Sequence, residues 1–258
     1  MSKIIVNLMG KIFVKMLFVG MLIVVICQLT SGQLNGNLVR TNRPLSSSFN
    51  EIVVDGPFDV FLSSTTMTNP NPMVEVESVS ELQSRIIVEI VENHVLSVRI
   101  IGVNQIVTKL NIYIHHPLSL RRYTFVGAGN TVTDGNGISN EDNQVFVVDH
   151  RGTGNIRMQL NVFNLQYDFS GTGDSLLSGQ VRQQAVFNAK GTGEINALNL
   201  SSRTASVFAT GVGDVQITAI EDLQIESTGI SNVKYRLPQG RRPSKVVSTG
   251  LGQIIPLA

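Results

Sequence analysis

The chain has 258 residues, of which 42% are hydrophobic and only 15% are charged, so it can bury a sizeable core. Its formal net charge is +1, and three lysines with no acid lie in the first 32 residues. The body of the chain is therefore near neutral, which excludes attraction of nucleic acid through counterion release. The 23 glycines and the low charge favour many short strands joined by tight turns, which predicts an all-β fold.

Residues 1–32 have the features of a targeting segment. A run of 12 apolar residues ends at Cys27, which suits the core of a signal peptide and is short for a membrane span. Small residues just upstream predict cleavage before Gln33. The alternative is an uncleaved single-pass anchor formed by residues 4–29. We expect a secreted or cell-surface protein, periplasmic or on the outer surface in a bacterium, that touches a membrane only through this segment if it is uncleaved.

The next segment, residues 33–48, is polar and has no period, so it predicts a short linker. Residues 49–258 then predict one domain, whose first part, 49–120, is rich in short strands. The alternating or β-branched stretches in that part are 49–55, 60–62, 73–79, 86–91, 95–101 and 110–114. Prolines at positions 70 and 72 mark a loop, because proline cannot donate to a strand ladder.

The second part, residues 121–258, repeats one motif seven times: a strand, Gly-x-Gly, a polar residue and another strand. The first glycines of the seven copies are 25, 19, 20, 20, 18 and 21 residues apart. A period near 20 predicts a parallel β-helix-like β-solenoid of about seven C-terminal coils. The glycines expected at its corners are Gly127, Gly129, Gly152, Gly154, Gly171, Gly173, Gly191, Gly193, Gly211, Gly213, Gly229, Gly250 and Gly252.

Glycine suits such corners because it reaches positive φ without strain and lets neighbouring chain segments approach closely. Ser231 replaces the second glycine of one copy, which predicts an irregular corner there. The change Ser231→Gly is accordingly expected to be neutral or mildly stabilising.

Columns of similar residues accompany the glycines. Four residues before each first glycine every copy has an apolar or aromatic residue: Tyr123, Val148, Tyr167, Phe187, Val207, Ile225 and Val246. Three residues after it every copy has a polar residue: Asn130, Asn155, Asp174, Glu194, Asp214, Asn232 and Gln253. Such columns are expected when strands stack about 4.8 Å apart and share one core.

Three stretches carry a resemblance to a known family: FNEIVVDGPFDVFL at 49–62, HPLSLRRYTFVGAG at 116–129, and the repeated Gly-x-Gly corners followed by Asp, Glu or Asn. The chain resembles the putative auto-transporter adhesin head GIN domain family over roughly 49–258. The resemblance implies an extracellular or periplasmic setting, a signal sequence and a β-helical architecture. It implies no catalytic residue.

Recognised catalytic and cofactor motifs are missing. No Gly-x-Gly-x-x-Gly opens a helix after a strand, and there is no Gly-Lys-Ser/Thr phosphate loop, so we expect no nucleotide cofactor. The single cysteine, Cys27, excludes a disulfide framework and a cysteine-based metal site. Asn199 lies in the sequon Asn-Leu-Ser, which predicts glycosylation in a eukaryotic host.

The polar column could indicate calcium, which β-roll proteins bind in Gly-Asp loops. Those rolls repeat every nine residues, whereas this period is about 20 and only two copies have aspartate. We therefore interpret the column as a hydrogen-bonded ladder at the corners and expect no metal site.

Asp149 and Asp168 share another column and could form the acid/base pair of a polysaccharide-cleaving β-helix. The same column holds Asn188 and Phe208 in the next copies, which is typical of a solvated outer face. The sequence thus favours a non-catalytic secreted or surface module for adhesion, matrix or glycan contact. Its partner would be an unidentified extracellular glycan or protein, not nucleic acid. The alternative is a carbohydrate-active β-helix enzyme that uses acidic residues on one face.

Overall fold

The computed structural model describes residues 37–65, 71–103, 110–134 and 137–257. The segment predicted as signal peptide or anchor, its cleavage before Gln33 and the span 4–29 lie outside the described residues. Within the described ranges, no helix is long and apolar enough to cross a membrane.

Strands dominate the described residues. They are β1 (Leu38–Arg43), β2 (Glu51–Asp55), β3 (Asp59–Ser64), β4 (Met73–Val79), β5 (Ile86–Val91), β6 (Val95–Ile100), β7 (Asn111–His116), β8 (Arg122–Phe125), β9 (Thr131–Thr133), β10 (Ile138–Ser139), β11 (Val145–His150), β12 (Ile156–Val162), β13 (Asn164–Phe169), β14 (Ser175–Ala189), β15 (Ile195–Ala209), β16 (Val215–Ser227), β17 (Val233–Arg236), β18 (Lys245–Ser248) and β19 (Ile254–Pro256). One short helix, α2 (Ser80–Gln83), and a 3-10 turn, η1 (Glu92–His94), interrupt them.

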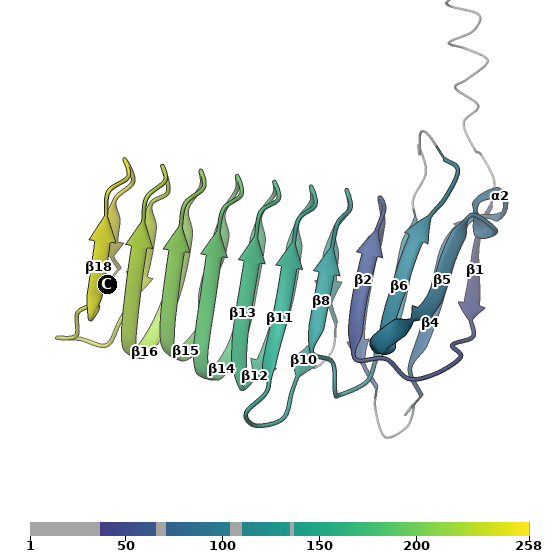
Figure 1. Ribbon diagram of the computed structural model, residues 1–258, viewed down its shortest axis with the longest axis horizontal. Coiled ribbons are helices and arrows are strands. Elements are labelled where there is room, and N and C mark those ends of the chain that lie inside the picture. Colours follow the sequence, from purple (N-terminus) through teal and green to yellow (C-terminus); the bar gives the residue numbers. More distant parts are fainter. Residues whose placement is uncertain (1–36, 66–70, 104–109, 135–136, 258) are drawn as a thin grey trace, which may run out of the picture. The chain divides into compact units, whose positions relative to one another are not determined.

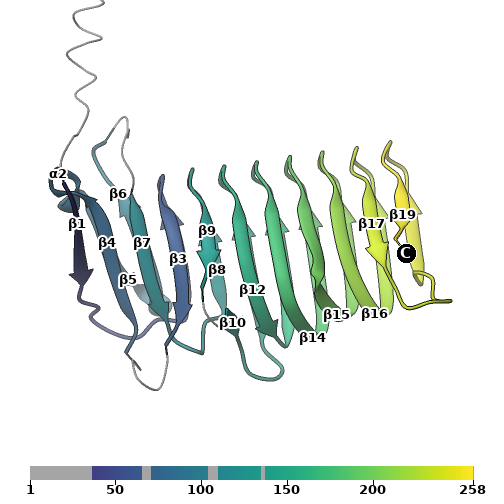
Figure 2. The same cartoon turned by 180° about the vertical axis from the view of Figure 1, so that it is seen from behind.

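The strands lie in two facing layers (Figures 1 and 2). β2, β8, β11 and β13 belong to one layer, and β3, β9 and β12 to the other. The long strands β14, β15 and β16 bend and run through both layers. β14, for example, pairs with β12 through Ser175–Val181 and with β13 through Ala185–Ala189. The core therefore lies between two layers of the same sheet.

The predicted fold class, a parallel β-solenoid, is wrong. All the described strands belong to one 19-stranded sheet of mixed orientation, which folds over until it almost closes on itself. The pairs β1–β4, β4–β7 and β5–β6 are antiparallel. The physical reason lies in the connections: three residues, Glu92–His94, join β5 to β6, and so short a link can join only antiparallel neighbours. The Gly-x-Gly period carries no information about these strands.

Part of the predicted linker 33–48 is a strand. β1 pairs antiparallel with β4, from Leu38 opposite Val79 to Arg43 opposite Val74. Its side chains are mostly exposed, which is why its sequence shows no apolar period. This segment therefore extends the sheet at the N-terminal end of the described chain.

The column four residues before each first glycine appears directly in the strand register. Tyr123 pairs with Val148, Val148 with Tyr167, and the same register continues through the later copies to Val246. Ile52 of β2 pairs with Tyr123 as well. Gly56 therefore begins a further copy of the motif, which the sequence conceals because Phe58 stands at the second glycine position.

Close approach of the backbone explains the first glycine of each corner. A Cβ at Gly191 would lie 2.2 Å from the carbonyl oxygen of Gly171 and 2.9 Å from Phe169 Cε1. Positive φ instead belongs to second glycines, such as Gly193 at +138°. Second glycines are crowded as well: a Cβ at Gly193 would lie 2.1 Å from the carbonyl oxygen of Gly173, so close approach and positive φ both favour glycine there.

The corner that contains Ser231 departs from the others. Gly154, Gly173 and Gly193 each donate a backbone hydrogen bond to the middle residue of the next copy. At Ser231 the side-chain hydroxyl donates instead to the carbonyl oxygen of Gly211, over 3.0 Å, and the residue is buried. Replacement by glycine would remove this bond, so we now expect Ser231→Gly to destabilise the fold rather than leave it unchanged.

Candidate functional site

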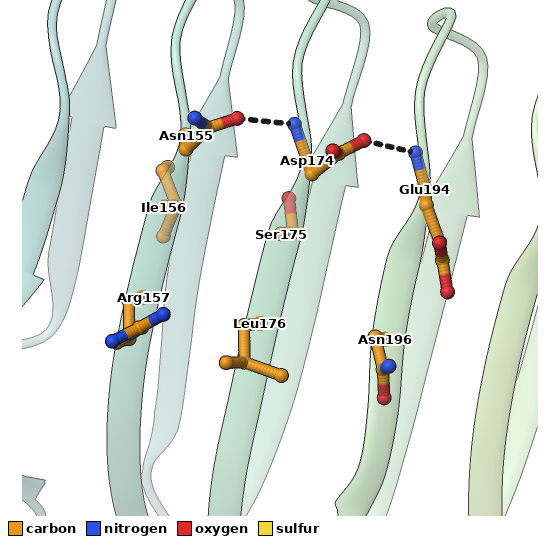
Figure 3. A pocket seen from close by; sticks show the side chains of 8 residues that line it. All are labelled: Asn155, Ile156, Arg157, Asp174, Ser175, Leu176, Glu194 and Asn196. Carbon is orange, nitrogen blue, oxygen red and sulfur yellow. Dashed lines mark hydrogen bonds between the residues drawn. The ribbon is translucent and has the colours of Figure 1, made fainter.

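The polar column forms a ladder of side-chain to backbone hydrogen bonds. The backbone N–H of Asp174 donates to Asn155 Oδ1 over 2.9 Å, and that of Glu194 donates to Asp174 Oδ1 over 3.0 Å (Figure 3). The ladder begins outside the seven copies, where the N–H of Asn130 donates to Asp59 Oδ1. Short polar side chains suit this column because their oxygens reach the next strand.

A groove lies beside the ladder, on the outer face of β12, β14 and β15. Its volume is about 310 Å³, and its lining residues are Asn155, Ile156, Arg157, Asp174, Ser175, Leu176, Glu194 and Asn196. The ladder residues form one side, and Arg157, Leu176 and Asn196 form the other (Figure 3). Arg157 pairs with Leu176 and Leu176 with Asn196 in the strand register, so this side is also a row across the strands.

The chemistry of the groove is mixed and polar. It offers one guanidinium, the carboxylates of Asp174 and Glu194, and the amides of Asn155 and Asn196. One oxygen of Asp174 is engaged in the ladder, and Glu194 accepts a hydrogen bond from Gln216. The groove therefore presents both donors and acceptors with little net charge, an arrangement that suits hydroxyl-rich, uncharged ligands.

In the described part of the chain, no group of three or more His, Cys, Asp or Glu side chains is arranged to hold a metal ion. In the polar column, the backbone N–H of Asn232 and the ammonium of Lys234 both donate to Asp214. That carboxylate is thus held by protein donors.

Asp149 and Asp168 lie opposite each other in the strand register, as the shared column predicts. Asp149 forms a two-pronged ion pair with Arg151 and is largely buried. Asp168 accepts hydrogen bonds from Gln166 Nε2, over 2.7 Å, and from Asn188 Nδ2, over 2.6 Å. Both carboxylates are therefore held by donors from the protein itself.

Two pairs of buried hydroxyl groups were not predicted from the sequence. Tyr167 donates a hydrogen bond to Ser175 Oγ over 2.6 Å, and Tyr123 forms the same contact with Thr131. Burial raises the pKa of both tyrosines. The sequence contains a signal for these contacts. Only two of the seven copies have tyrosine four residues before the first glycine, and the same two copies have Ser or Thr four residues after it.

A buried histidine was also missed. His150 is fully buried between the rings of Phe125 and Phe169, at centroid distances of 6.0 and 5.1 Å. Among the described residues, neither of its ring nitrogens makes a hydrogen bond of ordinary geometry. Burial lowers its pKa to about 4. It lies in the core and is not part of the groove.

Asn199, the predicted glycosylation position, lies on β15 with an exposed side chain. It pairs with Ser178 next to a register irregularity between β14 and β15. A glycan at this position remains a prediction.

Comparisons with known proteins found a matching family model and similar solved structures. A model of the family described as "Putative auto-transporter adhesin, head GIN domain" matches residues 48–236. A crystal structure of a putative adhesin from Bacteroides fragilis is similar, with 25% identity, a TM-score of 0.75, and coverage of 86% of this chain and 97% of that one. No curated protein matches the chain.

Two structures from Parabacteroides distasonis share the fold at lower identity. One, described as a putative adhesin, has 19% identity and a TM-score of 0.58, and covers 86% of this chain and 98% of its own. The other, described as a putative lipid binding protein, has 18% identity and a TM-score of 0.60, and covers 87% and 98%.

Proposed function

The chain belongs to the putative auto-transporter adhesin, head GIN domain family, and from this premise we propose that it is a non-catalytic adhesion module that contacts an extracellular glycan. The observation that carries the proposal is the outer groove lined by Asn155, Arg157, Asp174, Glu194 and Asn196. A secreted or cell-surface location is part of the same proposal.

The fixed geometry of the groove supports a binding role. Its lining residues stand on three neighbouring strands, and the ladder holds Asn155 and Asp174 in place through the next strand's backbone. Polar groups that are already oriented lose little conformational entropy when a ligand binds. The rows run across the strands, with a step of about 4.8 Å. A chain of sugar rings lying across the strands would therefore meet one polar residue of the ladder, Asn155, Asp174 or Glu194, at each successive step.

The charge of the groove favours a neutral glycan. One guanidinium faces two carboxylates, so a sulfated or uronic polymer would bring its negative charges close to Asp174 and Glu194. Amide and guanidinium groups donate to sugar hydroxyls and to acetamido carbonyl groups, and the carboxylates accept from hydroxyls.

Calorimetric titration of residues 33–258 with chitohexaose, cellohexaose and heparin tests the proposal. We expect a neutral oligosaccharide to bind and heparin not to bind. Arg157→Ala and Asn196→Ala should each weaken binding about tenfold, because each removes hydrogen bonds to the ligand. The control Arg203→Ala removes another exposed arginine, which pairs with Glu221 and does not line the groove, and should bind like wild type.

Two results would contradict the proposal. Loss of affinity in Arg203→Ala equal to that in Arg157→Ala would show that the groove is not the site. Release of reducing ends from any of the sugars, abolished by Asp168→Asn, would instead assign the chain to the carbohydrate-active enzymes.

A further inference from the structure

The middle residue of the Gly-x-Gly corner changes character along the chain. In three successive copies it is threonine: Thr153, Thr172 and Thr192. In the last three it is aliphatic: Val212, Ile230 and Leu251, with exposed fractions of 50%, 56% and 84%. We call these three residues the aliphatic tips. Leu251 has the highest exposed fraction of the large hydrophobic residues in the described ranges.

The backbone holds the aliphatic tips in a row. The N–H of Val212 donates to the carbonyl oxygen of Gly191 over 3.0 Å, and the N–H of Leu251 donates to that of Gly229 over 3.0 Å. Ile230 makes the same bond one copy earlier, over 3.1 Å. Consecutive tips are therefore one strand spacing apart, about 4.8 Å. The corners form one edge of the two-layered sheet, where the strands of the two layers meet (Figures 1 and 2).

In the described chain, the carboxylates nearest to the tips in sequence, Asp214 and Glu226, each pair with a lysine. The residues just before the three first glycines are Thr210, Thr228 and Thr249. The corner before them carries the exposed Lys190 at the same position. Asp214 pairs with Lys234 over 2.7 Å. Aliphatic side chains beside threonines and a lysine match the boundary between acyl chains and headgroups of an anionic lipid surface.

We propose that the aliphatic tips insert into the surface of a lipid bilayer that contains anionic lipids. A second copy of the chain is a poorer occupant, because three tip side chains cover far less than the roughly 800 Å² per partner of a standard protein interface. Insertion needs no such area, since each buried aliphatic group contributes separately. The membrane contact is separate from the glycan groove and does not depend on it.

Flotation of residues 33–258 with vesicles of phosphatidylcholine and phosphatidylglycerol, in a ratio of about 7:3, tests the proposal. We expect the protein to float with these vesicles and to float less with phosphatidylcholine alone. Ile230→Ser and Leu251→Ser should each lower the partition coefficient about tenfold, because each removes one inserted aliphatic side chain. Both side chains are exposed, so the variants should keep the wild-type melting temperature.

The matched control is Ile220→Ser. Ile220 is 46% exposed and lies midway along β16. At this point the strand crosses from one layer to the other, away from the corners. Its variant should float like wild type. Equal flotation of wild type and both tip variants would overturn the proposal, as would no flotation with either vesicle. A dimer in light scattering that Leu251→Ser abolishes would also overturn it, by assigning the tips to a second copy.

Discussion

The N-terminal part, strands β1–β7, includes the concealed copy at Gly56. It is held together differently from the motif part, strands β8–β19, which carries the seven visible copies. In the N-terminal part, individual side chains bridge neighbouring strands: Phe61 stacks on Tyr113 at 4.8 Å, and the Arg40 guanidinium lies 3.7 Å from the centre of the same tyrosine ring. In the motif part, backbone approaches backbone at glycines, and one polar side chain per copy bonds the next strand. The stability of the first part depends on contacts between particular side chains. The stability of the second part depends on glycines at positions where no side chain fits between neighbouring strands.

The difference also affects how each part presents residues to solvent. In the motif part the outer positions beside the ladder, such as Arg157 and Leu176, take no part in the glycine contacts or in the ladder bonds. The groove and the aliphatic tips both lie on this part. We infer that the motif strands form the scaffold and that their outer positions carry the binding chemistry.

The largest expected effect is that of Gly191→Val. Its Cβ would lie 2.2 Å from a backbone oxygen, so strands β13 and β14 would have to move apart. We expect a loss of about 3–5 kcal/mol of unfolding free energy, measured by thermal or urea unfolding. Gly252→Val should cost less, although its Cβ would lie 1.9 Å from the carbonyl oxygen of Ser231, because this corner can shift without disturbing a following copy. Gly240→Ala is the control for backbone strain, since Gly240 has φ of +83° but open space around it, and should cost about 1 kcal/mol. An equal loss at Gly240 and Gly191 would contradict the account of the corners.

Acid should also destabilise the core through His150. Its pKa of about 4 in the folded chain lies below the ordinary value of 6.5, so its contribution is complete above pH 6.5 and is lost as the pH falls from 6.5 to 4. The loss amounts to about 3 kcal/mol. Burial lowers the pKa of His116 as well, so part of the acid sensitivity belongs to that residue.

His150→Leu should flatten the pH dependence of the melting temperature, and part of the dependence that is left should come from His116. Melting curves from pH 4 to pH 8 would show this. A variant as acid-sensitive as wild type would mean that His150 is not a neutral buried group.

Tyr167→Phe should have an intermediate effect. It removes the hydrogen bond to Ser175 and leaves a buried hydroxyl without its partner, which costs about 1–2 kcal/mol. The double variant Tyr167→Phe with Ser175→Val imitates the neighbouring copy, where Phe187 accompanies Ile195. It should recover most of the loss in urea unfolding. No recovery would show that the two positions are not coupled.

The smallest effect belongs to the N-terminal part. Arg40→Met removes the contact with the Tyr113 ring and the ion pair with Glu75, in which the arginine side chain is 43% exposed. Exposed contacts of this kind contribute about 0.5–1 kcal/mol. Urea unfolding at low and high salt distinguishes the ring contact from the ion pair, because dissolved salt screens mainly the ion pair. A loss as large as that at Gly191 would remove the contrast between the two parts.

The features that could be predicted from the sequence are those that leave a regular pattern of apolar residues or glycines. The bounds of β2, β4, β5 and β6 follow the alternation of apolar residues, and the copies from Gly127 onward are visible from their glycines. Gly56 was overlooked because one substitution, Phe58, hides its copy. The antiparallel pairing of β1 with β4 was not predictable, since exposed polar residues leave no period and partners far apart in the chain leave no local signal. The groove was not predictable either: the ladder was expected, but the row opposite it depends on the strand register.

The most direct test of the central claim, that outer positions of the motif part bind a glycan, is a nuclear magnetic resonance titration. The side-chain amide signals of Asn155, Asn196 and Asn111 would be followed while chitohexaose or cellohexaose is added. The first two line the groove, whereas Asn111 lies on β7 of the N-terminal part and donates to Glu77. We predict that the signals of Asn155 and Asn196 shift in a saturable way and that the signal of Asn111 stays in place. Shifts at Asn111 with none at Asn155 and Asn196 would contradict the claim.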